Sequence, residues 1–339
     1  MAAAAESSGL TLGLYMSLII AYLFLNSSLN LINKWALGHA GFRFPFLLTS
    51  CHMLFGFCVL APVALRDGWE SHRATLRKQW RGVACIGAFL ALNIALSNIS
   101  LMDISLSLNQ IIRSAIPVVA CVLSIVVESK YPSPQEAASL VVLSCGVMLA
   151  VWQGTVAGKP YAIALSVAAT VSNAAMMTFS SKLMSEKLDV VRLTFYVAPV
   201  SLTCLAPFFW IYERESFAAY WPSHQEGAGL IMLVSSIMAI AYNLVHALMI
   251  KNVSVVATTV LGEFKIICLL VLSAMLLGEG SEFTFKMTLG CLLAMGGFAA
   301  YGHIKIKAAR EGVKPPLLAT SGSADRDLET QLLKKGGGA

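Results

Sequence analysis

Long apolar stretches with very few charges run along almost the whole chain. Each is about 18 to 24 residues long, which is what a helix needs to cross roughly 30 Å of hydrocarbon at about 1.5 Å per residue. The pattern predicts ten membrane-spanning helices, at residues 11–33, 44–65, 82–101, 105–127, 136–153, 160–181, 193–212, 228–249, 254–277 and 285–304. Very short connections follow the third and the eighth span, so each is expected to form a tight antiparallel hairpin with the next. The chain is predicted to be an all-α membrane protein.

Composition supports this class. Of the 339 residues, 57% are hydrophobic and 12% are charged, whereas a soluble globular protein has roughly 25% charged residues. The eight cysteines and six histidines form neither C-x-x-C nor H-x-x-x-H patterns, which argues against a metal site. No nucleophile–base pair is visible, so an enzyme is not expected. A cofactor and a nucleic-acid partner are not expected either. The expected partners are the lipid bilayer and a small molecule, and a homodimer stays open.

The distribution of basic residues orients the spans, because cytosolic loops carry an excess of Lys and Arg. Of the 24 Lys and Arg, seventeen fall on the side of the even-numbered loops and the C-terminal tail, five fall on the opposite side, and two lie inside spans. Both termini are therefore predicted in the cytosol, with residues 1–10 as an N-terminal segment and 306–339 as a disordered tail. No transit peptide is visible at the N-terminus.

The two halves of the chain resemble each other weakly. Ser105–Val151 is similar to Ser254–Gly302 at a shift of about 150 residues. With five spans in each unit, residues 11–153 and 154–305 would form two inverted repeats, an architecture that places the substrate between the repeats near the bilayer midplane. Small residues in the last span are expected to let helices approach closely; they are Gly296, Gly297, Ala299 and Ala300.

Two basic residues, Arg113 and Lys265, lie deep inside the fourth and ninth spans, at similar places in the two repeats. A cation at the bilayer centre costs at least roughly 2.5 kcal/mol, so it normally faces a cavity or a partner. One alternative is an ion pair with an acid such as Glu263 or Asp103, although residues two apart on a helix point in different directions. The other is a water-filled cavity in which both cations bind a phosphate group.

Polar side chains in the neighbouring spans are candidate ligand contacts. They are Asn93 and Ser97 in the third span, Asn109 and Gln110 in the fourth, and Tyr242 and Asn243 in the eighth. Each of these residues alone also fits a role in holding helices together. Glu263 either balances Lys265 or accepts hydrogen bonds from hydroxyl groups of the ligand.

Several short segments around these residues are distinctive. They are Leu31-Ile32-Asn33-Lys34-Trp35, Phe44-Pro45-Phe46, Thr49-Ser50-Cys51-His52, Ser97-Asn98-Ile99-Ser100-Leu101, Ile112-Arg113-Ser114-Ala115-Ile116-Pro117-Val118, Tyr242-Asn243 and Gly262-Glu263-Phe264-Lys265. Together they resemble the triose-phosphate translocator and nucleotide-sugar transporter family of the drug/metabolite transporter superfamily, over about residues 11–305. The resemblance implies that Arg113 and Lys265 hold phosphate and that Tyr242 and Ser97 also contact the ligand.

The chain departs from the plastid members of that family at three positions. Lys265 is followed by Ile266 instead of a second cation, and Ile94 and Ile116 stand where those members carry His and Glu. These differences favour the endomembrane branch, in the Golgi or the endoplasmic reticulum, over the plastid envelope. The resemblance then implies a secondary-active antiporter that exchanges a nucleotide sugar or sugar phosphate for phosphate or a nucleoside monophosphate.

Two other functions fit the sequence. One is a proton-coupled drug or metabolite exporter in which Glu263 carries the proton, although two intramembrane cations would repel a cationic cargo. The other is a non-transporting membrane adaptor that recruits partners through the basic tail near Lys334. Loss of transport in Glu263→Gln with tolerance of Lys265→Ala would indicate the exporter, and an effect of tail deletion would indicate the adaptor.

Overall fold

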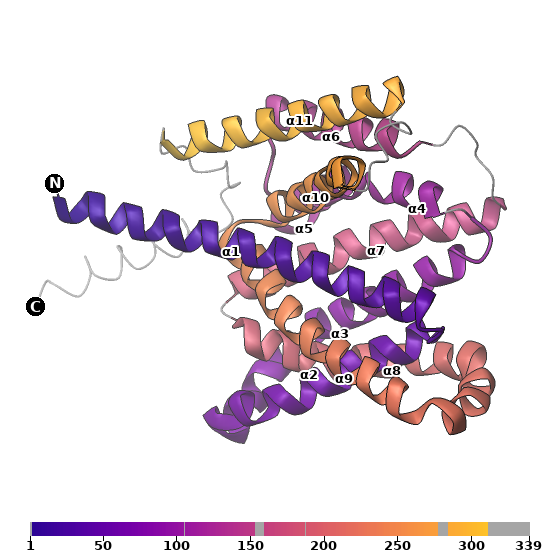
Figure 1. Cartoon of the computed structure of the whole chain (residues 1–339). Coiled ribbons are helices and arrows are strands. Elements are labelled where there is room, and N and C mark those ends of the chain that lie inside the picture. The colour runs from indigo at the N-terminus through magenta and orange to yellow at the C-terminus, as the bar shows by residue number, and fades with distance from the viewer. Residues whose placement is uncertain (1, 105, 153–158, 187, 277–283, 311–339) are drawn as a thin grey trace, which may run out of the picture.

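The computed structural model describes residues 2–104, 106–152, 159–186, 188–276 and 284–310. Helices dominate these ranges, which contain no β-strand, so the predicted all-α class is confirmed (Figure 1). In chain order the helices are α1 (Ala2–Lys34), α2 (Pro45–Ala64), α3 (Gly68–Ser100), α4 (Leu106–Arg113), α5 (Ile116–Glu128), α6 (Pro134–Val151), α7 (Pro160–Ser185), α8 (Val190–Phe208), α9 (Arg214–Asn252), α10 (Val255–Leu276) and α11 (Phe285–Arg310).

Eight stretches within the described ranges are long and apolar enough to cross a membrane. One of them, Val190–Asn252, has 63 residues and contains both α8 and α9. The chain is thus an integral membrane protein by the length and composition of its helices. The count of ten spans and the inverted relation of the two halves stay predictions.

The fourth predicted span consists of two helices instead of one. α4 ends at Arg113 and α5 begins at Ile116. Pro117 lies in the first turn of α5, where proline is compatible with a helix start but would interrupt a continuous helix, because it lacks an N–H group. The break leaves Arg113 at the C-terminal end of α4, where the negative end of the helix dipole stabilises a cation.

The segment between the seventh and eighth predicted spans is also helical. α9 begins at Arg214, well before residue 228, and a π-helical turn at Phe209–Glu213 joins it to α8. His224 has non-helical backbone angles two residues after Pro222, which marks a kink in α9. The extra turns before the kink extend α9 beyond the predicted span.

α6 and α11 pack side by side (Figure 1). A Cβ atom on Gly146 would lie 2.3 Å from the backbone nitrogen of Ala294, and one on Gly290 would lie 2.3 Å from that of Ala150. The partner's residue number falls along α11 as it rises along α6, so the two helices are antiparallel. The backbones touch because neither glycine has a side chain.

The predicted small-residue contacts of the last span are only partly right. A Cβ on Gly297 would lie 2.6 Å from the backbone nitrogen of Leu143, so this glycine does permit close packing. Gly296, Ala299 and Ala300 are exposed instead. The prediction was wrong for these three because the sequence does not show which face of the helix meets α6.

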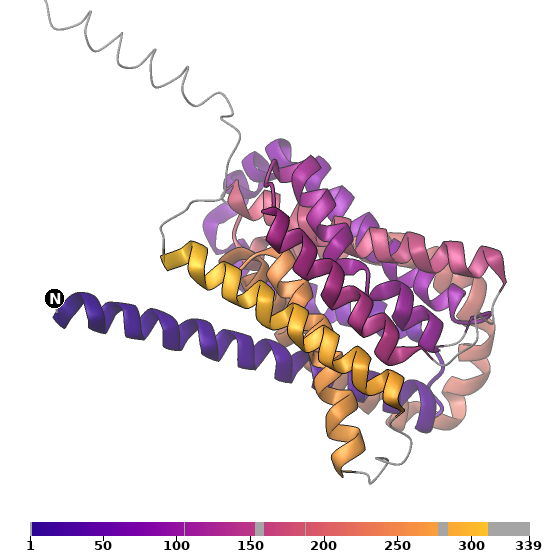
Figure 2. The same ribbon diagram turned by 90° about the horizontal axis from the view of Figure 1, so that it is seen from above.

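The remaining helices pack in an interlaced order. α3 packs against α7 and α8, α2 packs against α8 and α9, α1 packs against α9, and α5 packs against α10. Helices from before residue 153 are therefore layered against helices from after it. In Figure 2 the first part of α1 extends away from this bundle, while α11 lies along it.

The two ends of the chain differ from the predicted segments. α1 begins at Ala2, so residues 2–10 belong to a helix. α11 continues to Arg310, five residues past the predicted end of the second repeat. Residues 306–310, predicted as the start of the disordered tail, therefore belong to α11. The rest of the predicted tail, from residue 311 onward, lies outside the described residues.

Candidate substrate site

Arg113 lies at the end of α4 and is half-buried. Its Nη1 atom donates long hydrogen bonds of 3.4 Å to Oδ1 of Asn93 and to Oγ of Ser97. These two residues are one turn apart on α3 and thus share a face of that helix. Both acceptors are neutral, so neither of them offsets the positive charge of the guanidinium group.

Lys265 lies in the middle of α10 and is also half-buried. Its Nζ atom donates a hydrogen bond of 2.8 Å to Oδ1 of Asn26 on α1. The same oxygen accepts a hydrogen bond of 2.7 Å from Nδ2 of Asn30. Asn26 was not among the predicted site residues, although an amide side chain inside an apolar span was a signal.

Glu263 is buried, with 5% of the residue exposed. Electrostatic interactions couple its carboxylate to both Arg113 and Lys265, and they couple the two cations to each other, so the three groups share one region. Among the described residues, neither cation lies within 4.0 Å of a carboxylate oxygen. Asp103, the other acid considered, pairs with Lys159 instead, at 2.7 Å.

Aromatic rings from α1 and α9 stack beside these charges. The centroid of Tyr242 lies 5.3 Å from that of His246 and 6.2 Å from that of Tyr22, and Tyr22 and His246 are 5.8 Å apart. Tyr242 interacts electrostatically with Arg113, and Tyr22 does so with Glu263. Tyr22 and His246 were not predicted, because only the fold brings α1 next to α9; a histidine inside an apolar span is uncommon and was a signal for His246.

The other predicted contacts are placed differently. Asn109 is buried and donates hydrogen bonds to Oγ of Ser100 at 3.3 Å and of Ser166 at 3.1 Å, so it joins α4 to α3 and α7. Gln110 and Asn243 are half-buried, and their side chains form no hydrogen bond with described residues. The ligand contacts of these three residues stay predictions.

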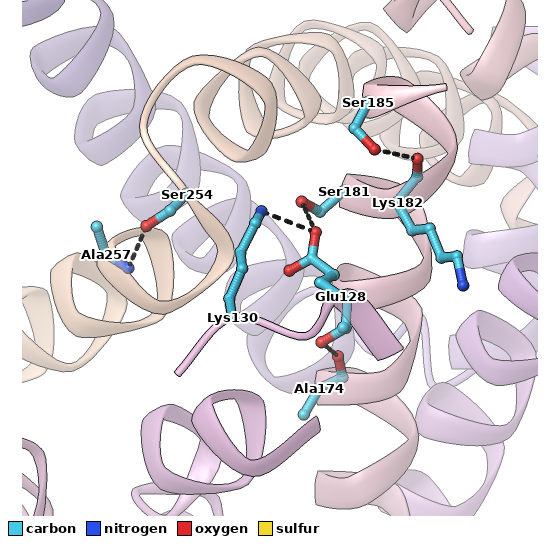
Figure 3. Close-up of polar contacts among 9 residues, drawn as sticks. Glu128, Lys130, Ala174, Ser181, Lys182, Ser185, Ser254 and Ala257 are labelled. Atoms are coloured by element: carbon cyan, nitrogen blue, oxygen red, sulfur yellow. Dashed lines mark hydrogen bonds and ion pairs between the residues drawn. The ribbon is translucent and has the colours of Figure 1, made fainter. Parts of the chain in front are cut away.

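Polar contacts join the two halves of the chain at the end of the bundle where α5 and α7 finish. Oε1 of Glu128, the last residue of α5, accepts a hydrogen bond of 2.6 Å from Oγ of Ser181 on α7 and pairs with Nζ of Lys130 at 3.0 Å (Figure 3). Nearby, Oγ of Ser254 accepts from the N–H of Ala257 and caps α10.

A second set of contacts joins the halves at the opposite end of α7. Lys159 precedes α7 and pairs with Asp103, which also accepts a hydrogen bond from the hydroxyl group of Tyr161. Tyr161 and Ser181 both lie on α7 and are 20 residues apart in the sequence, so the two sets of contacts are roughly 30 Å apart at about 1.5 Å per residue. Arg113 lies between Asp103 and Glu128 along the chain. The contacts of these two acids are called the two polar ties below.

A separate cavity of about 760 Å³ lies between the end of α1 and the first part of α9. Trp35, Tyr220 and His224 are among its lining residues. None of the predicted site residues lines it. In the described ranges, no group of three or more His, Cys, Asp or Glu side chains could hold a metal ion.

Comparisons with known proteins agree with this architecture. Residues 12–302 match the sequence model of the Triose-phosphate Transporter family. A probable sugar phosphate/phosphate translocator of Arabidopsis thaliana is 27% identical over 318 residues, covering 91% of each chain. The UDP-uronic acid transporter 1 of the same plant is 26% identical, covering 85% of this chain and 94% of its own. A solved crystal structure with 17% identity superposes with a TM-score of 0.63, covering 86% of this chain and 96% of its own, which shows the fold alone.

Proposed function

Because the chain belongs to the triose-phosphate transporter family, we propose that it is a secondary-active antiporter. It exchanges a nucleotide sugar or a sugar phosphate for phosphate or a nucleoside monophosphate. The observation that carries this proposal is the arrangement of Arg113 and Lys265. Both are half-buried cations, one from each half of the chain, and both are hydrogen-bonded to neutral oxygens only, among the described residues. Two such charges suit a phosphoryl group.

The packing of α6 against α11 supports two inverted repeats. Gly146 meets Ala294, and Gly290 meets Ala150 in return. An antiparallel contact between the last helix of each half is what a two-fold relation between similar units requires.

The interlaced packing of the other helices supports the same relation. If α1, α2 and α3 correspond to α7, α8 and α9, the contact of α3 with α7 corresponds to that of α1 with α9. The contact of α3 with α8 likewise corresponds to that of α2 with α9. In a ten-helix chain of this kind each half has five spans, so the second half enters the bilayer from the other side.

Transport follows from the charges in this arrangement. With the site free of substrate, Arg113 and Lys265 repel each other across the halves. A bound phosphoryl group would attract both cations and draw the halves together, and the halves would then rock to open the other side. The ties at Glu128 and at Asp103 would have to open in turn, one at each end. Exchange is strict if the halves rock only with an anion bound.

We place this exchange in an endomembrane, Golgi or endoplasmic reticulum, with both termini in the cytosol. The excess of basic residues on the even-numbered loops supports the orientation. Ile94, Ile116 and Ile266, which replace polar residues of the plastid members, support the endomembrane. Protease protection of a tag fused to either end would test the orientation, and co-staining with organelle markers would test the compartment.

Reconstitution in liposomes tests the exchange. A thermal-shift screen against nucleotides, nucleotide sugars and sugar phosphates first identifies the ligand, because a ligand stabilises the state that it binds. Uptake of the labelled ligand is then measured with and without an internal counter-anion. We expect uptake only with the counter-anion, and its loss in Lys265→Ala but not in Lys251→Ala, since Lys251 is exposed at the end of α9. Uptake into unloaded liposomes would refute strict antiport.

A further inference from the structure

The carboxylate of Glu263 is the least satisfied polar group near the cations. The residue is only 5% exposed, and its Oε2 atom is buried without a hydrogen-bond partner among the described residues. An ionised carboxylate is rarely buried unless it is paired, because the loss of water around it is unfavourable. The position therefore calls for a donor that the described side chains do not provide.

The two cations do not act as that donor. Arg113 directs its Nη1 at Asn93 and Ser97, and Lys265 directs its Nζ at Asn26. Glu263 and Lys265 are two residues apart on α10, so their side chains leave the helix in different directions. Glu263 therefore shares the electrostatic field of the cations without forming an ion pair at contact distance.

The chemistry of a carboxylate restricts what can bind there. The Oε2 atom, which has no partner in the described part of the chain, can accept a hydrogen bond, and when the carboxylate is ionised it also repels a phosphate group. A ligand that satisfies both parts of the site needs phosphoryl oxygens for Arg113 and Lys265 and a hydroxyl group for Glu263. Sugar phosphates and nucleotide sugars carry hydroxyl groups on carbon atoms beside the phosphoryl group, whereas the only hydroxyl of inorganic phosphate is on the phosphorus that the two cations hold.

We propose that Glu263 accepts a hydrogen bond from a substrate hydroxyl group beside the phosphoryl group, and that it thereby selects hydroxylated organic phosphates over inorganic phosphate. This inference rests on the proposed function, since it assumes that Arg113 and Lys265 hold the phosphoryl group. It adds a role in specificity that the two cations cannot supply, because they attract every phosphate alike.

Four probes separate the hydroxyl contact from the phosphate contact: inorganic phosphate, methyl phosphate, glucose 1-phosphate and UDP-glucose. Their dissociation constants are measured by thermal-shift titration of the purified full chain. In Glu263→Gln we expect at least about tenfold weaker binding of the two glucose compounds, because a hydrogen bond to a charged acceptor is about twice as strong as one to a neutral acceptor. Inorganic phosphate and methyl phosphate should bind equally well or more tightly, since a negative charge is removed.

Further variants keep the test decisive. Glu263→Asp retains the charge but shortens the side chain, and we expect weaker binding of the glucose compounds with unchanged binding of inorganic phosphate; this variant replaces Glu263→Gln if that protein does not fold. Glu226→Gln, at an exposed position on α9, is the control and should leave all four constants unchanged.

Equal changes for all four probes, or a wild-type protein that binds the glucose compounds no better than methyl phosphate, would overturn the role of Glu263. Failure of the proposed function looks different, because Lys265→Ala would then leave all four constants unchanged.

Discussion

The Nζ atom of Lys265 lies 2.8 Å from Oδ1 of Asn26, so a neutral amide from the first helix holds a cation from the second half of the chain. An amide oxygen fixes the position of an ammonium group without cancelling its charge. An acid at the same place would hold it more strongly but would neutralise it. The pair therefore joins the two halves of the chain and keeps the positive charge available to an anion.

Substitutions of Asn26 should show that its amide group positions Lys265 without neutralising the positive charge. Asn26→Ala removes a hydrogen bond to a charged group, worth about 1.5 to 3 kcal/mol, so we expect KM for the organic phosphate to rise about tenfold or more. Asn26→Asp should reduce uptake further, because the new carboxylate would pair with Lys265. Asn252→Ala, at an exposed position, serves as the control in the same liposome assay. Wild-type uptake in both Asn26 variants would contradict the assignment.

The α6–α11 contact predicts opposite effects for two glycine substitutions. In a helix, Gly→Ala is normally stabilising by about 1 kcal/mol. Gly296→Ala should follow this rule, because nothing lies within 4 Å of the new Cβ. Gly146→Ala should instead lower Tm by several degrees, since overpacking costs about 1 to 3 kcal/mol and the neighbouring atom is backbone. Tm in detergent is measured for both proteins, and a stabilised Gly146→Ala would disprove the close contact.

The polar ties at the two ends of α7 predict opposite shifts in accessibility. A cysteine is placed at Asn243 in a protein whose native cysteines have been replaced, and its labelling is followed from each membrane face. Ser181→Ala should increase labelling from one face and Lys159→Ala from the other, by about threefold each if each tie contributes about 0.6 kcal/mol. Labelling that increases from the same face in both variants would argue against the two ties as opposing gates.

Two asparagines near Arg113 should behave differently. Asn109 forms buried hydrogen bonds with Ser100 and Ser166. Asn109→Ala should lower Tm, because the two buried hydroxyl groups lose this partner. KM should stay within about twofold of the wild-type value. Asn93 accepts a long hydrogen bond from Arg113, so Asn93→Ala should raise KM with little change in Tm. If Asn109→Ala also raised KM strongly, Asn109 would belong to the substrate site.

Part of the site was predictable because charges inside apolar spans stand out. Arg113, Lys265 and Glu263 are conspicuous in the sequence for this reason, and the repeat suggests that the first two are related. Their neighbours were less accessible. Asn93 and Asn109 look alike in the sequence, since both are amides in an apolar span, yet one contacts the cation and the other joins three helices.

The sequence by itself determined the class of the protein, because uninterrupted apolar stretches can satisfy their backbone hydrogen bonds in a bilayer only as helices. It also marked the deep cations, since a charge in lipid is unfavourable unless it has a purpose. Only the tertiary structure decided which faces meet. Three features depend on the rotation and neighbours of each helix: the contact of Lys265 with Asn26, the stack of Tyr22 on His246, and the Glu263 oxygen that has no partner in the described part of the chain. Nearly every residue of a membrane helix is apolar, so the sequence carries little signal for that rotation.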